Sequence, residues 1–138
     1  MAVGCGGGDD DGTAAADEVT TSTLSKAEFV KKANSICVKK SQDLLEEMRE
    51  FADEPAGASA QEAIQQLWPP ALRDEAEEIR SLGAPEGGEA KVEAYLASLE
   101  KVTGEIEAKM PKDIFKLQEI LMGVNSAAAA YDLESCEF

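Results

Sequence analysis

The stretch LSKAEFVKKANSIC, residues 24–37, decides the fold because it shows how the folded part of the chain begins. Ser25 and Glu28 have the spacing of a capping box, in which each side chain bonds to the backbone N–H group of the other residue. Apolar residues then recur every three or four positions, which predicts a helix over residues 26–52. Its expected inner face comprises Phe29, Ala33, Ile36, Cys37, Leu44, Met48 and Phe51.

A second apolar stripe is interrupted by two consecutive prolines, Pro69 and Pro70. Proline has no backbone N–H group to donate, and it disfavours helical angles in the residue before it. We therefore expect two shorter helices, about 60–68 and 70–82, joined by a sharp bend.

Two further stripes complete the pattern. The third helix is expected to begin near Gly88 and to end at Pro111, and the fourth is expected to end near Leu133. No segment shows the sustained alternation of a strand. The sequence thus predicts an all-α fold, an antiparallel up-and-down four-helix bundle formed by residues 25–138, with the second helix broken at Pro69-Pro70. The expected inward positions of the last two helices are Val92, Tyr95, Leu96, Leu99, Val102 and Ile106, then Ile114, Leu117, Leu121, Val124, Ala128 and Tyr131.

Residues 1–24 lack such a stripe. They contain five acidic residues and no lysine or arginine, and glycine, alanine and threonine fill most of the rest. This composition predicts a disordered, acidic, Gly/Ala-rich tether in front of the helical domain.

The charge of the chain excludes one large class of partners. It has 28 acidic and 13 basic residues and a formal net charge of −15. A protein that binds nucleic acid neutralises phosphates with lysine and arginine, and a field of this sign repels them. Direct electrostatic docking on anionic lipid headgroups is disfavoured for the same reason.

Three cysteines leave at least one without a partner in the chain. Cys37 lies on the expected inner face of the first helix, and Cys136 follows the last helix. In an antiparallel bundle the end of the fourth helix approaches the first, so a Cys37–Cys136 disulfide fits an oxidising compartment. The alternative is a small buried residue at position 37 and a free thiol at position 136. Cys5 is then left alone in the tether.

Three short motifs resemble those of small cell-envelope lipoproteins of the Gram-positive, actinobacterial type. They are VGCGGGDDD around Cys5, LSKAEFVKKANSIC at the start of the domain and AAAAYDLESC at its end. The resemblance implies acylation of Cys5, a disulfide between Cys37 and Cys136, and an extracytoplasmic, lipid-anchored helical domain. The charged and apolar regions of a signal peptide do not precede Cys5, because Met1 lies only four residues before it. We expect a truncated start; the alternative is a cytoplasmic chain whose Cys5 carries no lipid.

The sequence lacks the residue types that several catalytic and metal-binding sites require. The chain has no histidine, which excludes catalytic triads with a histidine base and the usual zinc sites, so no metal and no cofactor are expected. Carboxylates cluster at two places, which we interpret as solvated faces because no calcium-binding loop is present. The clusters are Glu46, Glu47 and Glu50, and Asp74, Glu75, Glu77 and Glu78.

Tyr95 and Tyr131 are expected at the edge of the core with their hydroxyl groups at the surface.

The most distinctive local feature is Trp68 in front of the two prolines. A tryptophan at a helix bend either fills a corner of the core or lines a groove for a partner side chain or a small apolar ligand. The candidate groove residues are Trp68, Pro69, Pro70 and Leu72.

These observations favour a non-enzymatic, lipid-anchored extracytoplasmic lipoprotein. Its helical domain is then a binding or interaction module for an unidentified protein or small apolar ligand, and it contacts the membrane only through acylated Cys5. The alternative function is a soluble carrier that holds a small apolar ligand inside the bundle near Trp68, Leu72 and Leu99. A third hypothesis, an enzyme that uses two carboxylates, lacks a pair of acids that the sequence would bring together.

Overall fold

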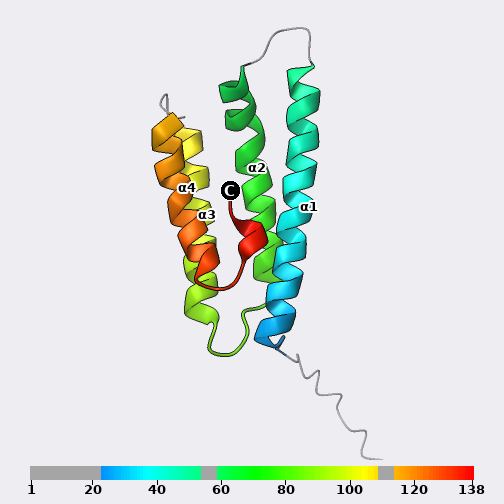
Figure 1. Cartoon of the computed structure of the whole chain (residues 1–138), viewed down its shortest axis with the longest axis vertical. Helices are drawn as coiled ribbons and strands as arrows, with labels where there is room; N and C mark the ends of the chain where they lie inside the picture. Colours follow the sequence, from blue (N-terminus) through cyan, green and yellow to red (C-terminus); the bar gives the residue numbers. More distant parts are fainter. Residues whose placement is uncertain (1–22, 54–58, 109–113) are drawn as a thin grey trace, which may run out of the picture.

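The computed structural model describes residues 23–53, 59–108 and 114–138. Within these ranges the chain is all-α and contains no strand, which confirms the predicted class (Figure 1). Nearly all of the predicted tether, residues 1–22 with Cys5, lies outside the described residues. The elements are α1 (Lys26–Ala52), α2 (Ala60–Ser81), α3 (Glu89–Ala108), α4 (Ile114–Ala129) and a short 3-10 helix, η1 (Glu134–Cys136).

Capping boxes fix the starts of the first two helices. At α1, the backbone N–H of Glu28 donates to Oγ of Ser25 at 3.3 Å, and the backbone N–H of Ser25 donates to Oε2 of Glu28 at 3.0 Å. Ser59 and Glu62 repeat both bonds at α2, at 3.2 Å and 2.8 Å. Each box satisfies backbone donors that a helix start would otherwise leave unpaired.

The break expected at Pro69 and Pro70 is not confirmed. One helix runs through both prolines from Ala60 to Ser81. Proline removes a backbone hydrogen bond, and packing of the amphipathic face supplies much of the stability of a helix in a protein. Pro69 is buried and Pro70 is exposed, so the pair presents one ring to the interior and one to solvent.

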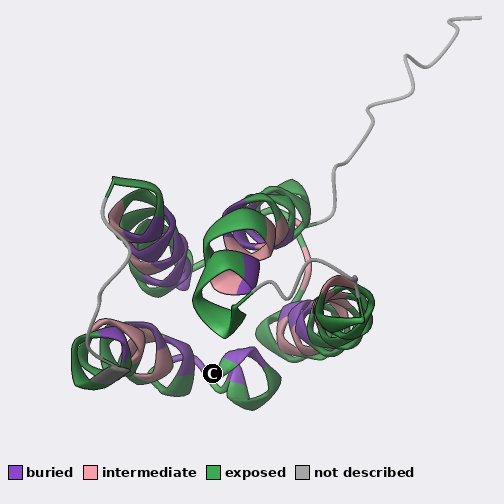
Figure 2. Cartoon of the chain, turned by 90° about the horizontal axis from the view of Figure 1, so that it is seen from above, coloured by how far each residue is buried: buried purple, intermediate pink, exposed green. Residues whose placement is uncertain are grey.

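Each helix packs on the next one along the chain, α1 on α2, α2 on α3, and α3 on α4. In the described part of the chain α1 and α4 do not approach each other directly, whereas η1 contacts both. The C-terminal segment therefore lies between the first and last helices (Figures 1 and 2). Its short helix, rather than α4 itself, closes this side of the molecule.

A sharp reversal after α4 directs the chain towards α1. The backbone N–H of Leu133 donates to the carbonyl of Ala128 at 3.0 Å, and that of Asp132 donates to the carbonyl of Ala129 at 3.3 Å. This is a Schellman motif, which requires a residue in the left-handed region. Asp132 occupies it with a φ of 61°.

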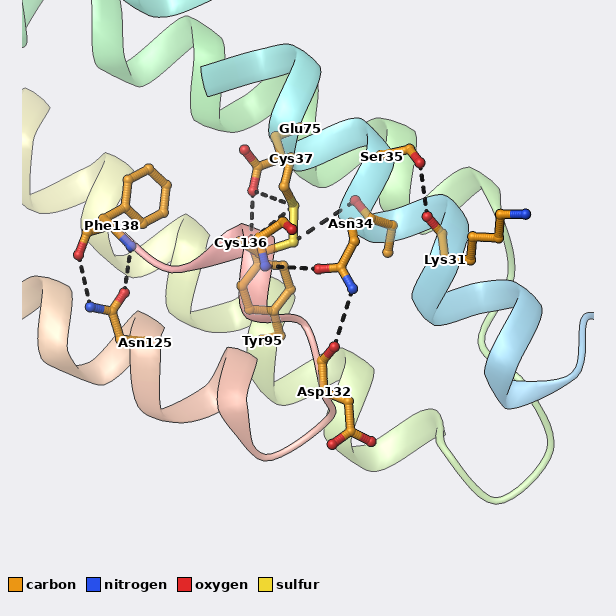
Figure 3. The surroundings of a disulfide bond; sticks show 12 residues. Lys31, Asn34, Ser35, Cys37, Glu75, Tyr95, Asn125, Asp132, Cys136 and Phe138 are labelled. Atoms are coloured by element: carbon orange, nitrogen blue, oxygen red, sulfur yellow. Dashed lines mark hydrogen bonds between the residues drawn. A yellow bond between two sulfur atoms is a disulfide. The ribbon is translucent and has the colours of Figure 1, made fainter. Parts of the chain in front are cut away.

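Polar groups of α1 hold the returning segment. Nζ of Lys26 lies 2.6 Å from Oδ2 of Asp132. The side-chain amide of Asn34 donates to the carbonyl of Asp132 at 3.2 Å and accepts from the backbone N–H of Ser135 at 2.9 Å. These bonds fix η1 against α1, as Figure 3 shows around Asn34.

The core forms where all these elements meet. Most of the predicted inward residues are buried in one cluster, although Leu44, Met48 and Phe51 in the second half of α1 are only half-buried. The side chain of Ile114 is outside the described residues. None of the described helices is long and apolar enough to cross a membrane. The cluster comprises Phe29, Ala33, Cys37, Leu72, Ala76, Ile79, Val92, Tyr95, Leu96, Leu99, Val102, Ile106, Val124, Ala128, Tyr131, Leu133 and Cys136.

Candidate functional site

A disulfide bond joins Cys37 on α1 to Cys136 in η1, as predicted (Figure 3). The two Cα atoms lie 5.0 Å apart, and the side chains are buried in the core. The partners are separated by 99 residues in the sequence, and a loop of this length corresponds to about 4 to 5 kcal/mol in the chain-entropy model. The route of the chain differs from the expected one, because η1 and not the end of the fourth helix brings Cys136 to α1.

A carboxyl group packs against this disulfide. Oε1 of Glu75, on α2, lies 3.5 Å from Sγ of Cys37, and only 4% of Glu75 is exposed. A disulfide sulfur has no proton, so the sulfur donates nothing to the carboxyl in this state. Burial disfavours the charged carboxylate and raises the pKa of Glu75 above its ordinary value.

Tyr95 on α3 completes the group. Its hydroxyl donates to Oε1 of Glu75 at 2.6 Å and lies 3.9 Å from Sγ of Cys37. Burial, and then the neighbouring Glu75, raise the pKa of Tyr95, so its hydroxyl remains a donor. We call Cys37, Cys136, Glu75 and Tyr95 the disulfide–carboxyl cluster; its members come from η1 and three different α-helices.

The lysine whose charge acts on Glu75 forms ion pairs with other carboxylates. Lys40 on α1 lies with Nζ 2.7 Å from Oε1 of Glu78 and 3.9 Å from Oδ2 of Asp74. Its charge opposes the rise in the pKa of Glu75, as does the hydrogen bond from Tyr95, whereas the carboxylate of Glu78 adds to that rise. Burial outweighs these influences, and within the described residues no ion pair reaches Glu75.

Two sequence-based expectations about this cluster are wrong. Tyr95 was expected to extend its hydroxyl to the surface, but it is completely buried. Glu75 was expected on a solvated face, yet it packs inside the molecule. A signal was present, because Glu75 lies three residues after Leu72 and four before Ile79, on the apolar stripe of α2. The other carboxylates of the two clusters are exposed, as expected: Glu46, Glu47, Glu50, Asp74, Glu77 and Glu78.

Trp68, one of the predicted groove residues, is half-buried. Its indole N–H donates to Sδ of Met48 at 3.5 Å. Its ring centroid is 5.8 Å from that of Phe138, the last residue of the chain, with 34° between the planes. Trp68 therefore contacts a side chain of α1 and the C-terminal segment.

The four predicted groove residues differ in how far they are buried. Leu72 is 2% exposed and belongs to the core, and Leu99, which the carrier hypothesis invokes, is completely buried. Leu72 also lines a surface hollow of about 330 Å³ between α2 and α3, to which Trp68, Pro69 and Pro70 do not contribute. Salt bridges with the opposite helix neutralise both arginines of that hollow; the pairs are Arg73 with Glu107 and Arg80 with Glu100.

The disulfide–carboxyl cluster also brings together side chains of the types that bind metal ions. Potential ligand atoms of Cys37, Glu75 and Cys136 lie within 4.8 Å of one another. The metal ligand that cysteine provides is a thiolate, and the disulfide contains none. In the disulfide form the arrangement therefore supports acid–base and thiol–disulfide chemistry rather than metal binding.

No family model, curated protein or solved structure matches this chain.

Proposed function

We propose that the chain is a non-enzymatic lipoprotein of the cell envelope. Acylated Cys5 anchors it to the outer face of the cytoplasmic membrane, residues 1–24 act as the spacer, and the helical domain serves as a binding or interaction module. Acylated Cys5 is the only contact with the membrane in this proposal.

The observation that carries the proposal is the buried Cys37–Cys136 disulfide. Structural disulfides form and persist in oxidising compartments and are rare in the cytosol. Pairing of these two residues also leaves Cys5 as the one cysteine of the sequence without a partner in the chain. An exposed thiol is a liability in such a compartment, and acylation removes it.

For the domain, we propose an antiparallel up-and-down arrangement of the four helices. It is supported by the packing of each α-helix on its neighbour in the sequence. Short connections between consecutive helices favour antiparallel neighbours. The C-terminal segment then acts as a fifth element that seals the side between α1 and α4.

The binding surface that we propose centres on Trp68. Large aromatic rings with a polar edge dominate binding energy at protein interfaces. Phe138, which contacts the Trp68 ring, is 38% exposed, so the aromatic pair is accessible from outside. A net charge of −15 favours a partner with basic groups around an apolar centre.

Expression of the gene with its upstream DNA in an actinobacterial host, followed by intact-mass measurement of each cell fraction, tests the anchor. We expect the protein in the membrane fraction with a diacylglycerol-sized addition at Cys5. A Cys5→Ala variant should lose both the addition and the membrane association while its helical domain folds normally. Unmodified wild-type protein in the cytosolic fraction would contradict the proposal.

A further inference from the structure

Glu75 is a carboxyl group in a place where stability alone does not favour one. Its side chain is 4% exposed, and within the described chain no cation pairs with it. Burying a carboxylate is strongly unfavourable unless it is paired or takes up a proton. Oε1 of this carboxyl lies 3.5 Å from Sγ of Cys37, which belongs to the disulfide.

We propose that Glu75 accepts the proton of the Cys37 thiol while the Cys37–Cys136 bond forms. In this proposal the disulfide–carboxyl cluster is a thiol–disulfide exchange site, and Glu75 is its general base. The inference rests on the disulfide and does not depend on the membrane anchor.

The reaction requires an oxidant that itself carries a disulfide, such as a thiol–disulfide oxidoreductase. The Cys136 thiol first exchanges with the oxidant, which forms a mixed disulfide on Cys136 and releases one oxidant thiol. Cys37 then gives its proton to Glu75, and its thiolate attacks Sγ of Cys136. The bond between Cys136 and the oxidant breaks, the Cys37–Cys136 bond forms, and the second oxidant sulfur leaves as a thiolate. Over both steps two electrons pass from the two cysteines to the oxidant.

The positions of the two cysteines assign this order. Cys136 lies in the three-residue helix η1, which the disulfide and the bond from Ser135 to Asn34 hold on α1, so an oxidant reaches it while η1 is undocked. Cys37 lies in the middle of α1 beneath side chains of α2 and α3. Docking of η1 then brings Cys136 to the sulfur that already faces Glu75.

Other groups near Cys37 do not suit the role of base. The raised pKa of Tyr95 keeps its hydroxyl protonated, and this hydroxyl donates to Oε1 of Glu75. Lys40 is protonated and paired with Glu78 and Asp74. Tyr95 is therefore a positioning residue that holds the carboxyl beside the sulfur.

The proton balance of the cluster fits this direction of transfer. In the reduced chain the Cys37 S–H group can donate to Oε1, and a hydrogen bond to a carboxylate favours its charged form. When the disulfide forms, this donor disappears and burial favours the neutral acid. The raised pKa of Glu75 beside the disulfide agrees with a carboxyl that retains the transferred proton.

The test follows the internal exchange step directly. Fully reduced protein, folded in buffer, is mixed with oxidised glutathione between pH 5 and pH 9, quenched with acid and analysed by intact mass. The rate at which the glutathione adduct converts to the internal disulfide is compared between wild type and Glu75→Gln. We expect a loss of at least about 10-fold at pH 6, because general bases contribute about 10²- to 10⁴-fold. The difference should shrink towards pH 9, where a free thiol of pKa about 8.5 ionises unaided.

Glu77→Gln provides the matched control, because Glu77 is exposed on the same helix. It should react like the wild type. In concentrated denaturant the wild type and Glu75→Gln should react at equal rates, since the cluster is no longer assembled. Equal rates of Glu75→Gln and wild type in buffer, or an equal loss in Glu77→Gln, would overturn the proposal.

A second measurement, made on the wild-type sequence, tests the proposal if reduced Glu75→Gln does not fold. The infrared carbonyl band of protonated carboxyl groups is recorded between pH 4 and pH 9 for the glutathione adduct and for the disulfide form. Because the pKa of Glu75 is raised beside the disulfide, we expect the band of one carboxyl group to persist to higher pH in the disulfide form than in the adduct. The same pH dependence of the band in both forms would overturn the proposal.

Discussion

Glu75 illustrates how one carboxyl group is accommodated between three helices and a disulfide. It receives a hydrogen bond from Tyr95 and lies against Cys37, but it has no ion pair in the described chain. Its ionisation therefore works against the folded state. In the disulfide form, burial favours the neutral acid over the carboxylate.

A Glu75→Gln substitution should change how stability depends on pH. The pKa of Glu75 is raised in the folded protein, so stability is fully present below its ordinary value of 4.5 and is lost as pH rises towards the folded-state pKa. One proton corresponds to a slope of at most about 1.4 kcal/mol per pH unit in this window. Glutamine stays neutral and keeps an acceptor for Tyr95, so the variant should match wild type near pH 4 and exceed it at higher pH.

Urea denaturation of the oxidised proteins between pH 4 and pH 8 measures this difference. Glu77→Gln, which alters an exposed carboxyl on the same helix, should not reproduce the trend. Parallel curves for Glu75→Gln and wild type would contradict the buried, cation-free environment of Glu75.

Some of the contacts between single residues could be predicted from the sequence. It predicted the pairing of Cys37 with Cys136, because Cys37 lies on an apolar stripe and an antiparallel bundle was expected to bring the end of the last helix to the first. The contact is made by η1 instead. The sequence did not predict the contact of Glu75 with Tyr95, although helical spacing placed both on inner faces. The acidic neighbours of Glu75 suggested a solvated surface, although its spacing from Leu72 and Ile79 already distinguishes it from Glu77 and Glu78.

Among the elements, α2 departs most from its expected form. Pro69 and Pro70 lie inside a continuous helix. Local rules predict a break there, because each proline removes a backbone donor. The apolar stripe of α2 packs on both α1 and α3, and this tertiary contact supports the helix through the prolines.

A Pro70→Ala substitution should stabilise the protein. Pro70 is exposed, so its ring contributes little packing, and alanine restores the N–H donor that the helix lacks at this position. Proline is about 3 kcal/mol less favourable than alanine inside a helix. Alanine also gives the unfolded chain more conformational freedom, which offsets about 0.4 to 1 kcal/mol of the stabilisation. We expect a gain of about 2 kcal/mol in the free energy of unfolding, measured by urea denaturation.

Pro69→Ala is the comparison variant, because the ring of Pro69 is buried. Loss of packing should reduce its gain below that of Pro70→Ala. A Pro70→Ala protein that is less stable than wild type would instead support a bend at this site.

Helix starts were easier to predict than the end of the fold. The capping box at Ser25 identifies from the sequence where α1 begins. The reversal at Asp132 and the three-residue η1 leave no periodic signal, because they are too short to show one. Their position depends on bonds to Lys26 and Asn34, which are about a hundred residues away in the sequence.

In the molecule as a whole, the C-terminal segment packs against both α1 and α4 and so connects the first and last helices. In the described part α1 and α4 do not approach each other, and η1 contacts both. Asn34 and the disulfide hold this segment on α1, and Asn125 on α4 bonds Phe138 twice, at 2.9 Å and 2.7 Å. The all-α class followed from composition and periodicity, but this closure by η1 required the structure.

The Cys37–Cys136 bond closes the helical domain. Alkylation of the native protein before reduction, followed by digestion and peptide mass mapping, tests it most directly. We predict that the peptides containing Cys37 and Cys136 appear linked and unlabelled, and that both take up label only after reduction. If both cysteines are labelled in native protein from an oxidising compartment, the disulfide and the exchange chemistry of Glu75 are contradicted, and the proposed envelope location loses the observation that carries it.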